Sequence, residues 1–173
     1  TMVHFVYPGW LAEEGGFLNA GAVEAFGRFA DLITDRWAGD GTLWVTFNEP
    51  LVFFKHEMTI GQVGFTDFSH FLDNVVAAHR LGYAAAHRAD PAAMVTMNEA
   101  YLPLATDFTD TLVGDRVADT VDFVGIDYYY AVALNNLTAI NAAWDDFAAV
   151  QPQPEGIYDA IKHYARAYPG KPI

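Results

Sequence analysis

The sequence predicts an α/β fold in which parallel strands alternate with helices, and three observations carry this prediction. Four short runs are almost continuously apolar, as strands covered on both faces require. The stretches between these runs place apolar residues at helical spacing. No hairpin turn signal separates the runs, which favours parallel βα units. The expected strands span residues 2–7, 43–47, 94–97 and 121–126.

Helices are expected between the strands. Apolar residues that step by three and four predict one helix face made of Val23, Phe26, Ala30, Ile33 and Trp37. The same spacing recurs along residues 72–83 and 157–168. The interval before the fourth strand leaves little room for a complete βα unit, so we expect only a short helix within residues 108–119 there.

Composition narrows the class of protein. The 173 residues suggest one domain over residues 1–173, or a piece of one. The 22 acidic and 9 basic residues give a net charge of −13, which disfavours nucleic-acid partners and anionic membrane surfaces. Cysteine is absent, which excludes disulfides and thiolate metal sites. The first residues lack the basic and apolar regions of a secretory leader, so we expect a cytoplasmic protein.

The two ends of the sequence predict an incomplete sheet. The chain opens directly in a strand, and at residues 170–173 a Gly-Lys turn leads into what reads as another strand. Four strands and this short start cannot close an eight-stranded barrel, so the sheet would have open edges. We therefore expect the sequence to be a portion of something larger.

The sharpest functional signal is the run Thr-Phe-Asn-Glu-Pro at residues 46–50, where the second strand ends. The carboxyl ends of the strands form the active face of parallel α/β barrels. There, Glu49 would be partly desolvated, and a raised pKa would suit it to donate a proton near neutral pH. The alternative is an ordinary polar turn, because single carboxylates in loops are common.

One feature of this run is physically awkward. Strict alternation along a strand sends Asn48 and Glu49 to opposite faces of the sheet. Both side chains can reach one pocket only if the strand bulges or twists at its end. Pro50 favours such a break, because proline cannot continue the ladder.

The run at residues 46–50 resembles the acid/base motif of family-1 glycoside hydrolases, the β-glucosidase and β-galactosidase group. Other stretches resemble further signatures of that family in the required order. They are residues 4–11 (His-Phe-Val-Tyr-Pro-Gly-Trp-Leu), the two Ala-His pairs within residues 78–87, residues 121–129 (Val-Asp-Phe-Val-Gly-Ile-Asp-Tyr-Tyr), residues 154–160 and residues 170–173. The resemblance covers barrel strands three to six and the approach to strand seven, and it implies a partial (β/α)8 TIM barrel.

The resemblance also implies retaining hydrolysis of a small β-glycoside by two glutamates, with no cofactor and no metal. Glu49 would be the acid/base. Asn48 would hydrogen-bond the sugar 2-hydroxyl, and His4 would bind a ring hydroxyl. Tyr129 would hold the carboxylate of the nucleophile in place.

The chain departs from the family pattern in ways that keep alternatives open. The family's nucleophile follows a stretch like residues 171–173, so the 173-residue chain alone is expected to be inactive. Asp127 stands where the family usually has Asn. One alternative is a noncatalytic sugar-binding protein derived from such a barrel. Another is a half-barrel that depends on a partner and associates through its open edges.

Three further polar residues are expected to play structural parts. Glu99 closes the next strand and is expected to be a solvated loop residue outside the site, because neighbouring strands would put both carboxylates on one side of the sugar. His79 lies on the apolar face of its helix and is expected to be a packed, hydrogen-bonded core residue. His163 is expected to be exposed on its helix.

Overall fold

The computed structural model describes residues 1–39, 42–102, 105–129 and 154–173. The elements follow one another as α1 (Gly9–Glu13), η1 (Gly16–Leu18), α2 (Ala20–Trp37), β1 (Leu43–Asn48), α3 (Pro50–Thr59), η2 (Phe65–Asp67), α4 (Phe68–Ala89), β2 (Met94–Ala100), α5 (Thr106–Thr109), the π-helical turn η3 (Asp110–Gly114), α6 (Asp115–Val117), η4 (Ala118–Thr120), β3 (Ile126–Asp127), η6 (Pro154–Gly156) and α8 (Ile157–Ala167). Of the helices in these ranges, none is both long and apolar enough to cross a bilayer.

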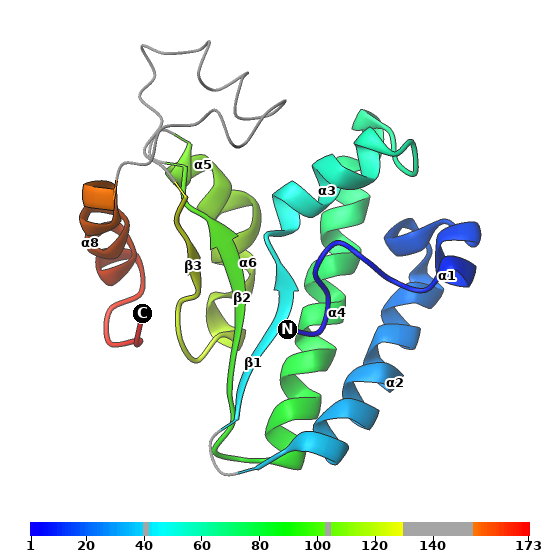
Figure 1. Cartoon of the computed structure of the whole chain (residues 1–173), viewed down its shortest axis with the longest axis horizontal. Helices are drawn as coiled ribbons and strands as arrows, with labels where there is room; N and C mark the ends of the chain where they lie inside the picture. The colour runs from blue at the N-terminus through cyan, green and yellow to red at the C-terminus, as the bar shows by residue number, and fades with distance from the viewer. Residues whose placement is uncertain (40–41, 103–104, 130–153) are drawn as a thin grey trace.

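The sheet confirms the expected parallel α/β arrangement. Its three strands lie in the order β1-β2-β3, and both pairs are parallel. Helix α4 packs against β1 and β2 and also against α2. β1 and β2 run toward the same edge of the sheet, where α3 begins (Figure 1). The strand ends that carry the polar motifs therefore meet at one edge.

The strand expected over residues 2–7 is reduced to one bridge. Val3 pairs with Phe47, and the Val3 carbonyl accepts a hydrogen bond from Asn48 N–H at 3.0 Å. Phe5 then adopts a φ of 63°, in the left-handed region that strands do not use. This turn stops the strand two residues after the bridge.

The strand expected over residues 121–126 is recognised only at its end, as β3. Two side chains replace backbone partners along this run. The Asp122 carboxylate accepts from Val95 N–H at 2.8 Å, and the Thr96 hydroxyl accepts from Gly125 N–H at 3.2 Å. The chain therefore follows β2 without forming a continuous backbone ladder.

Two shorter expectations have different outcomes. The short helix within residues 108–119 is confirmed, because helical turns continue without a break from α5 through η4. Residues 171–173 form no strand. They still lie beside the run that leads into β3, where Val124 N–H donates to the Pro172 carbonyl at 2.8 Å.

The expected helix faces are only partly buried. In α2, Phe26 and Ala30 are buried as expected, whereas Trp37 is 65% exposed. In α8, Tyr164 is buried but Ile157 and Ile161 are exposed. The described chain packs against only one side of α8, which leaves the rest of its apolar stripe at the surface.

His79 is confirmed as a packed core residue in α4. Its Nδ1 lies 2.7 Å from the Thr46 hydroxyl, and its Nε2 lies 2.9 Å from the Thr120 carbonyl. A carbonyl can only accept, so Nε2 carries the proton and Nδ1 accepts from Thr46. Burial lowers the pKa of His79 to about 4, so the imidazole is neutral in the folded protein.

This burial predicts how stability changes with pH. The pKa of His79 is lower in the folded chain than in the unfolded chain, so its contribution is complete above about pH 6.5 and is lost as the pH falls toward 4. At about 1.4 kcal/mol per pKa unit, this loss amounts to about 3 kcal/mol. Urea unfolding between pH 7 and pH 4 should therefore show a steeper loss of unfolding free energy for the wild type than for His79→Gln. Parallel curves would contradict this assignment.

Candidate active site

β1 contains one extra residue where it pairs with β2. The register pairs Val45 with Thr96, and the next pair is Asn48 with Asn98. Three steps along β1 therefore match two steps along β2, which defines a β-bulge. The break expected at this strand end is confirmed.

The bulge changes which backbone group bonds to β2. Near the start of the two strands, Met94 N–H donates to the Thr42 carbonyl, and in a parallel ladder every second residue of each strand bonds to its partner. If this pattern continued without a break, Asn48 N–H would donate to the Asn98 carbonyl. Glu49 N–H makes that bond instead, at 3.0 Å. Asn48 N–H turns to the N-terminal bridge. The two residues have thus shifted by one place relative to a regular strand.

Glu49 joins the bulged strand to α3 in an uncommon conformation. Its φ of 42° and ψ of 70° lie in the left-handed region, which costs a non-glycine residue roughly 1–2 kcal/mol. Pro50 follows as the first helical residue, a position that suits proline. The Glu49 carbonyl accepts from Phe53 N–H at 2.8 Å. The chain therefore turns from strand to helix at the carboxylate itself.

Four polar side chains meet at this edge. Asn98 Nδ2 donates to Asn48 Oδ1 at 3.0 Å and also to Asp127 Oδ2. The Asp127 carboxyl is in turn hydrogen-bonded to Glu49. A Cβ on Gly125 would lie 2.7 Å from the Cβ of Asn98, so glycine permits this close approach to β2. The bulge thereby brings Asn48 and Glu49 into one cluster.

The cluster favours the protonated form of Glu49. Glu49 is 4% exposed, and its burial, followed by the charge and hydrogen bond of Asp127, raises its pKa to about 7. A hydrogen bond from Tyr129 acts in the opposite direction. Burial also raises the pKa of Asp127, but the hydrogen bond from Glu49, the charge of His4 and the hydrogen bond from Asn98 all lower it. The shared proton therefore resides on Glu49, and Asp127 accepts.

The four residues named from the sequence fall in or beside this cluster. Asn48 and Glu49 are buried within it. Tyr129 is 47% exposed and hydrogen-bonded to Glu49. His4 is exposed on the N-terminal segment, where its charge acts on Asp127. Their roles toward a sugar remain predictions.

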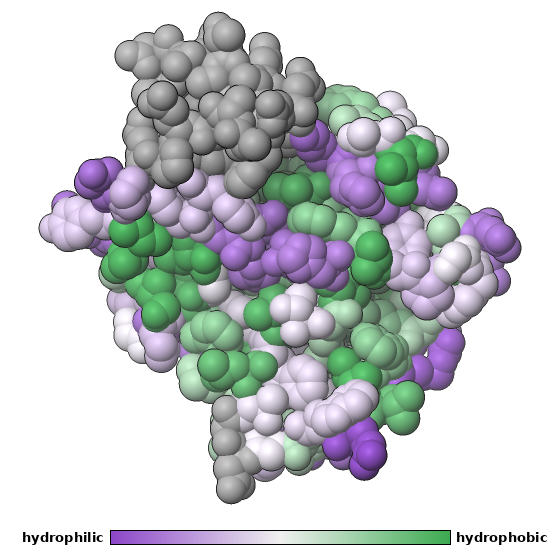
Figure 2. Space-filling view, in the orientation of Figure 1, coloured by the Kyte–Doolittle hydropathy of each residue, from purple (hydrophilic) through white to green (hydrophobic). Residues whose placement is uncertain are grey.

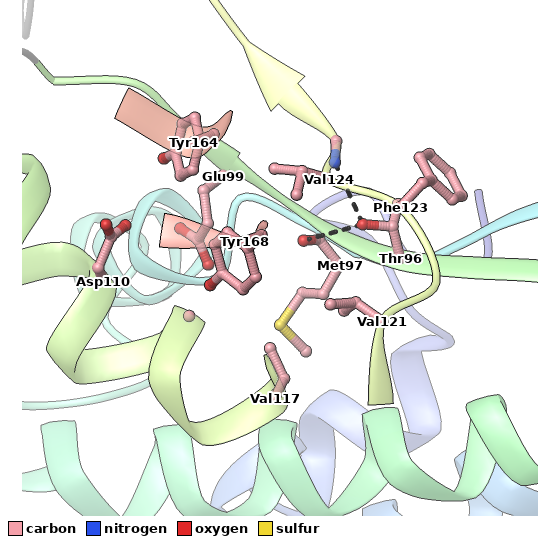
Figure 3. Close-up of a pocket in the computed structure, with 12 residues that line it drawn as sticks. Thr96, Met97, Glu99, Asp110, Val117, Val121, Phe123, Val124, Tyr164 and Tyr168 are labelled. Carbon is pink, nitrogen blue, oxygen red and sulfur yellow. Dashed lines mark hydrogen bonds between the residues drawn. The ribbon is translucent and has the colours of Figure 1, made fainter. Parts of the chain in front are cut away.

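The expectation that Glu99 is a solvated loop residue was wrong. Glu99 lies inside β2 and is 8% exposed. Alternation turns it away from Asn98, toward a cavity of about 20 Å³ that Asp110, Tyr164 and Tyr168 also line (Figure 3). Burial raises the pKa of Glu99 well above its usual range. Its carboxyl therefore belongs to the helix-facing side of the strand.

Sequence reasoning missed three polar residues, of which Asn98 and Asp127 belong to the cluster around Glu49 and His163 lies beside Asp110. Asn98 belongs to an Asn-Glu pair that ends β2 in the same way as Asn48 and Glu49 end β1, and Asp127 ends the strand after that. His163 was expected at the surface, yet its Nε2 lies 2.6 Å from Asp110 Oδ2 and its side chain is 25% exposed. The ends of adjacent parallel strands were the signal for the first two. Nothing in the spacing pointed to the third.

Comparison with known proteins identifies the family. The profile of the family described as "Glycosyl hydrolase family 1" matches residues 1–110, which is more than half of the chain. The chain therefore belongs to glycosyl hydrolase family 1. Asp127 and Tyr129 lie beyond the matched residues.

Individual relatives are similar over part of their length. Beta-glucosidase 23 of Arabidopsis thaliana is 33% identical over 86 residues, which is 49% of this chain and 16% of that protein. Beta-glucosidase 21 of the same plant is 41% identical over 63 residues, or 36% of this chain and 12% of that protein.

Solved structures extend the match along the chain. The β-glycosidase from Pyrococcus horikoshii superposes with a TM-score of 0.64 and 20% identity, over 94% of this chain and 48% of that one. The β-glycosidase from Thermosphaera aggregans gives 0.64 and 16%, over 88% and 42%. These matches confirm a partial (β/α)8 barrel fold. The chain spans less than half the length of the relatives it matches.

The left-handed backbone at Glu49 predicts an unusual order of stability. Glycine adopts this conformation without strain, whereas alanine does not. In urea titrations, the unfolding free energy of Glu49→Gly should therefore be about 1 kcal/mol higher than that of Glu49→Ala. The matched control is the exposed Ala84 in α4, where Ala84→Gly should instead lower the unfolding free energy by about 1 kcal/mol. A more stable Glu49→Ala would contradict the assigned backbone geometry.

Proposed function

We propose that this protein is a β-glucosidase-like hydrolase of O-glycosyl bonds and that Glu49 is its general acid/base. The observation that supports this most strongly is the buried Glu49 carboxyl at the end of a parallel strand, with its pKa raised to about 7. Such a group holds its proton near neutral pH and still releases it to a developing anion. Membership of the family supports the same reaction class.

In a retaining reaction Glu49 acts twice. It first protonates the glycosidic oxygen as the bond to the leaving group breaks, and it then takes a proton from the water that releases the sugar. Its Oε1 atom is buried and makes no hydrogen bond within the described chain. Oε1 is therefore free to accept the proton of the water in the second step.

Asn48 has an equally specific arrangement. Its Oδ1 accepts from Asn98, which fixes the amide so that Nδ2 is the group left over. Nδ2 is buried and has no hydrogen-bond partner in the described part of the chain. We propose that it donates to the sugar 2-hydroxyl, a contact that strengthens in the transition state.

The other two residues are assigned by the resemblance. We propose that the exposed His4 binds a ring hydroxyl beside the scissile bond. Tyr129 would hold the carboxylate of the nucleophile. In the described chain its hydrogen bond goes to Glu49, so it already reaches the reacting edge of the sheet.

The second carboxylate limits what the 173 residues do alone. A retaining pair needs carboxyls about 5–5.5 Å apart on either side of the bond. Asp127 is hydrogen-bonded to Glu49, so no sugar fits between them, and Glu99 faces the other side of β2. We therefore propose that the isolated chain does not hydrolyse glycosides.

The partners remain proposals of the same kind. The substrate would be a small β-glycoside, the location cytoplasmic, and nucleic acids and membranes would play no part. Association through the open barrel edge is supported by an apolar groove of about 310 Å³ beside α2, lined among others by Val6, Trp10 and Phe29. All three side chains are exposed. On the face of the molecule shown in Figure 2, separate hydrophobic areas lie among polar residues.

Hydrolysis of two β-glucosides tests the proposed function. The assay compares the 173-residue chain with the full translation product of its open reading frame. In the active form, Glu49→Gln should reduce turnover of an alkyl β-glucoside by roughly 10²–10⁴-fold, because its leaving group needs the proton. A nitrophenyl β-glucoside should lose less in the bond-breaking step, and added azide should restore turnover by replacing the water that Glu49 activates.

Glu99→Gln is the matched control, because it replaces a buried carboxyl of the neighbouring strand end by its isostere. It should retain most of the activity. Wild-type turnover of the alkyl glucoside by Glu49→Gln would contradict the role of Glu49. Turnover by the isolated chain would contradict its proposed inactivity.

A further inference from the structure

We infer that Asp127 is a positioning residue for Glu49: it accepts the hydrogen bond of the Glu49 carboxyl while Asn98 holds Asp127 in place. This inference rests on the proposed role of Glu49. It adds the residue that determines where the proton of that acid resides and which oxygen remains free. The family resemblance assigns no such role, because the family usually has Asn at this position.

The backbone holds Asp127 firmly. Its carbonyl accepts from Tyr101 N–H at 2.9 Å, and it pairs with Ala100 in the register of β2 and β3. Its side chain accepts from Asn98 Nδ2, whose other partner is Asn48. The acceptor oxygen for Glu49 is therefore fixed from two sides before any substrate arrives.

Two carboxyls in hydrogen-bond contact favour a state that shares one proton, because ionising both would place two like charges side by side. The Asn98 amide and the charge of His4 both favour the ionised form of Asp127. Glu49 receives one opposing contact, the hydrogen bond from Tyr129. These contacts favour the proton on Glu49 rather than on Asp127.

The titratable groups around this pair come from three segments. His4 belongs to the N-terminal segment and acts on Asp127. Tyr129 follows β3 and bonds to Glu49. Glu99 belongs to β2 and interacts with both carboxyls through space, although its side chain faces the helices. Asp127 is the one acid among them that is hydrogen-bonded to Glu49.

An isosteric change separates this role from simple packing. Asn at position 127 would keep the volume and could still accept from Asn98 through its oxygen. Its amide N–H would donate to Glu49 and stabilise the carboxylate instead of the acid. Asp127→Asn should therefore reverse the effect on Glu49 while leaving the fold in place.

Carbon-13 carboxyl NMR of the 173-residue chain measures this directly, without requiring hydrolysis. The titration midpoint of Glu49 should fall by about one pH unit or more in Asp127→Asn. Glu99→Gln, the matched control, should move it much less, because Glu99 makes no hydrogen bond to Glu49. If Asp127→Asn does not fold, Asp127→Ala removes the same acceptor and charge and should also lower the midpoint.

An unchanged Glu49 midpoint in a folded variant would overturn the positioning role. In a form that hydrolyses glycosides, the alkaline limb of kcat/KM should move to lower pH in Asp127→Asn, because the acid would lose its proton earlier. A shifted midpoint without any hydrolysis by the full product would uphold this inference and refute the proposed function. Hydrolysis that depends on Glu49, together with an unchanged Glu49 midpoint in Asp127→Asn, would uphold the proposed function and refute this inference.

Discussion

The extra residue at the end of β1 is the constraint on which the rest of the site depends. In a regular strand the amide of Asn48 and the carboxyl of Glu49 would point to opposite faces of the sheet. The bulge moves the bond to Asn98 from one residue to the next, and the left-handed turn at Glu49 completes the change of direction. The strain of that turn is retained where the chemistry is proposed, as strained backbone often is.

Support for the bulge comes from the core beneath it. Thr46 lies within the bulged stretch and donates its hydroxyl to His79, which is fully buried and bonded on its other side to Thr120. The neutral imidazole thus joins β1 to α4 and to the turn before β3. On the opposite face Asn98 joins Asn48 to Asp127. The end of β1 is therefore bonded to α4 through His79 on one face, and to side chains of β2 and β3 on the other face.

The sequence predicted the parallel arrangement and the need for a bulge because both follow from periodicity and from the place of one proline. It predicted burial of His79 for the same reason. The length of the outer strands was not predictable. The strand expected over residues 2–7 stops at the left-handed Phe5, and along residues 121–126 Asp122 and Thr96 replace backbone partners through contacts distant in sequence. Glu99 was misjudged because a strand end reads as a loop until the neighbouring helices are known. The pairing of Glu49 with Asp127 likewise depends on how closely Gly125 approaches β2.

The most direct test of the central claim is the scalar coupling through the hydrogen bond that ends the β1–β2 ladder. In the isotopically labelled, deuterated chain, a coupling between the Glu49 amide nitrogen and the Asn98 carbonyl carbon is the predicted result, since that bond spans 3.0 Å. A coupling from the Asn48 nitrogen to the same carbon would mean that the ladder is regular. Asn48 and Glu49 would then face opposite sides of the sheet, and the site as described would not exist.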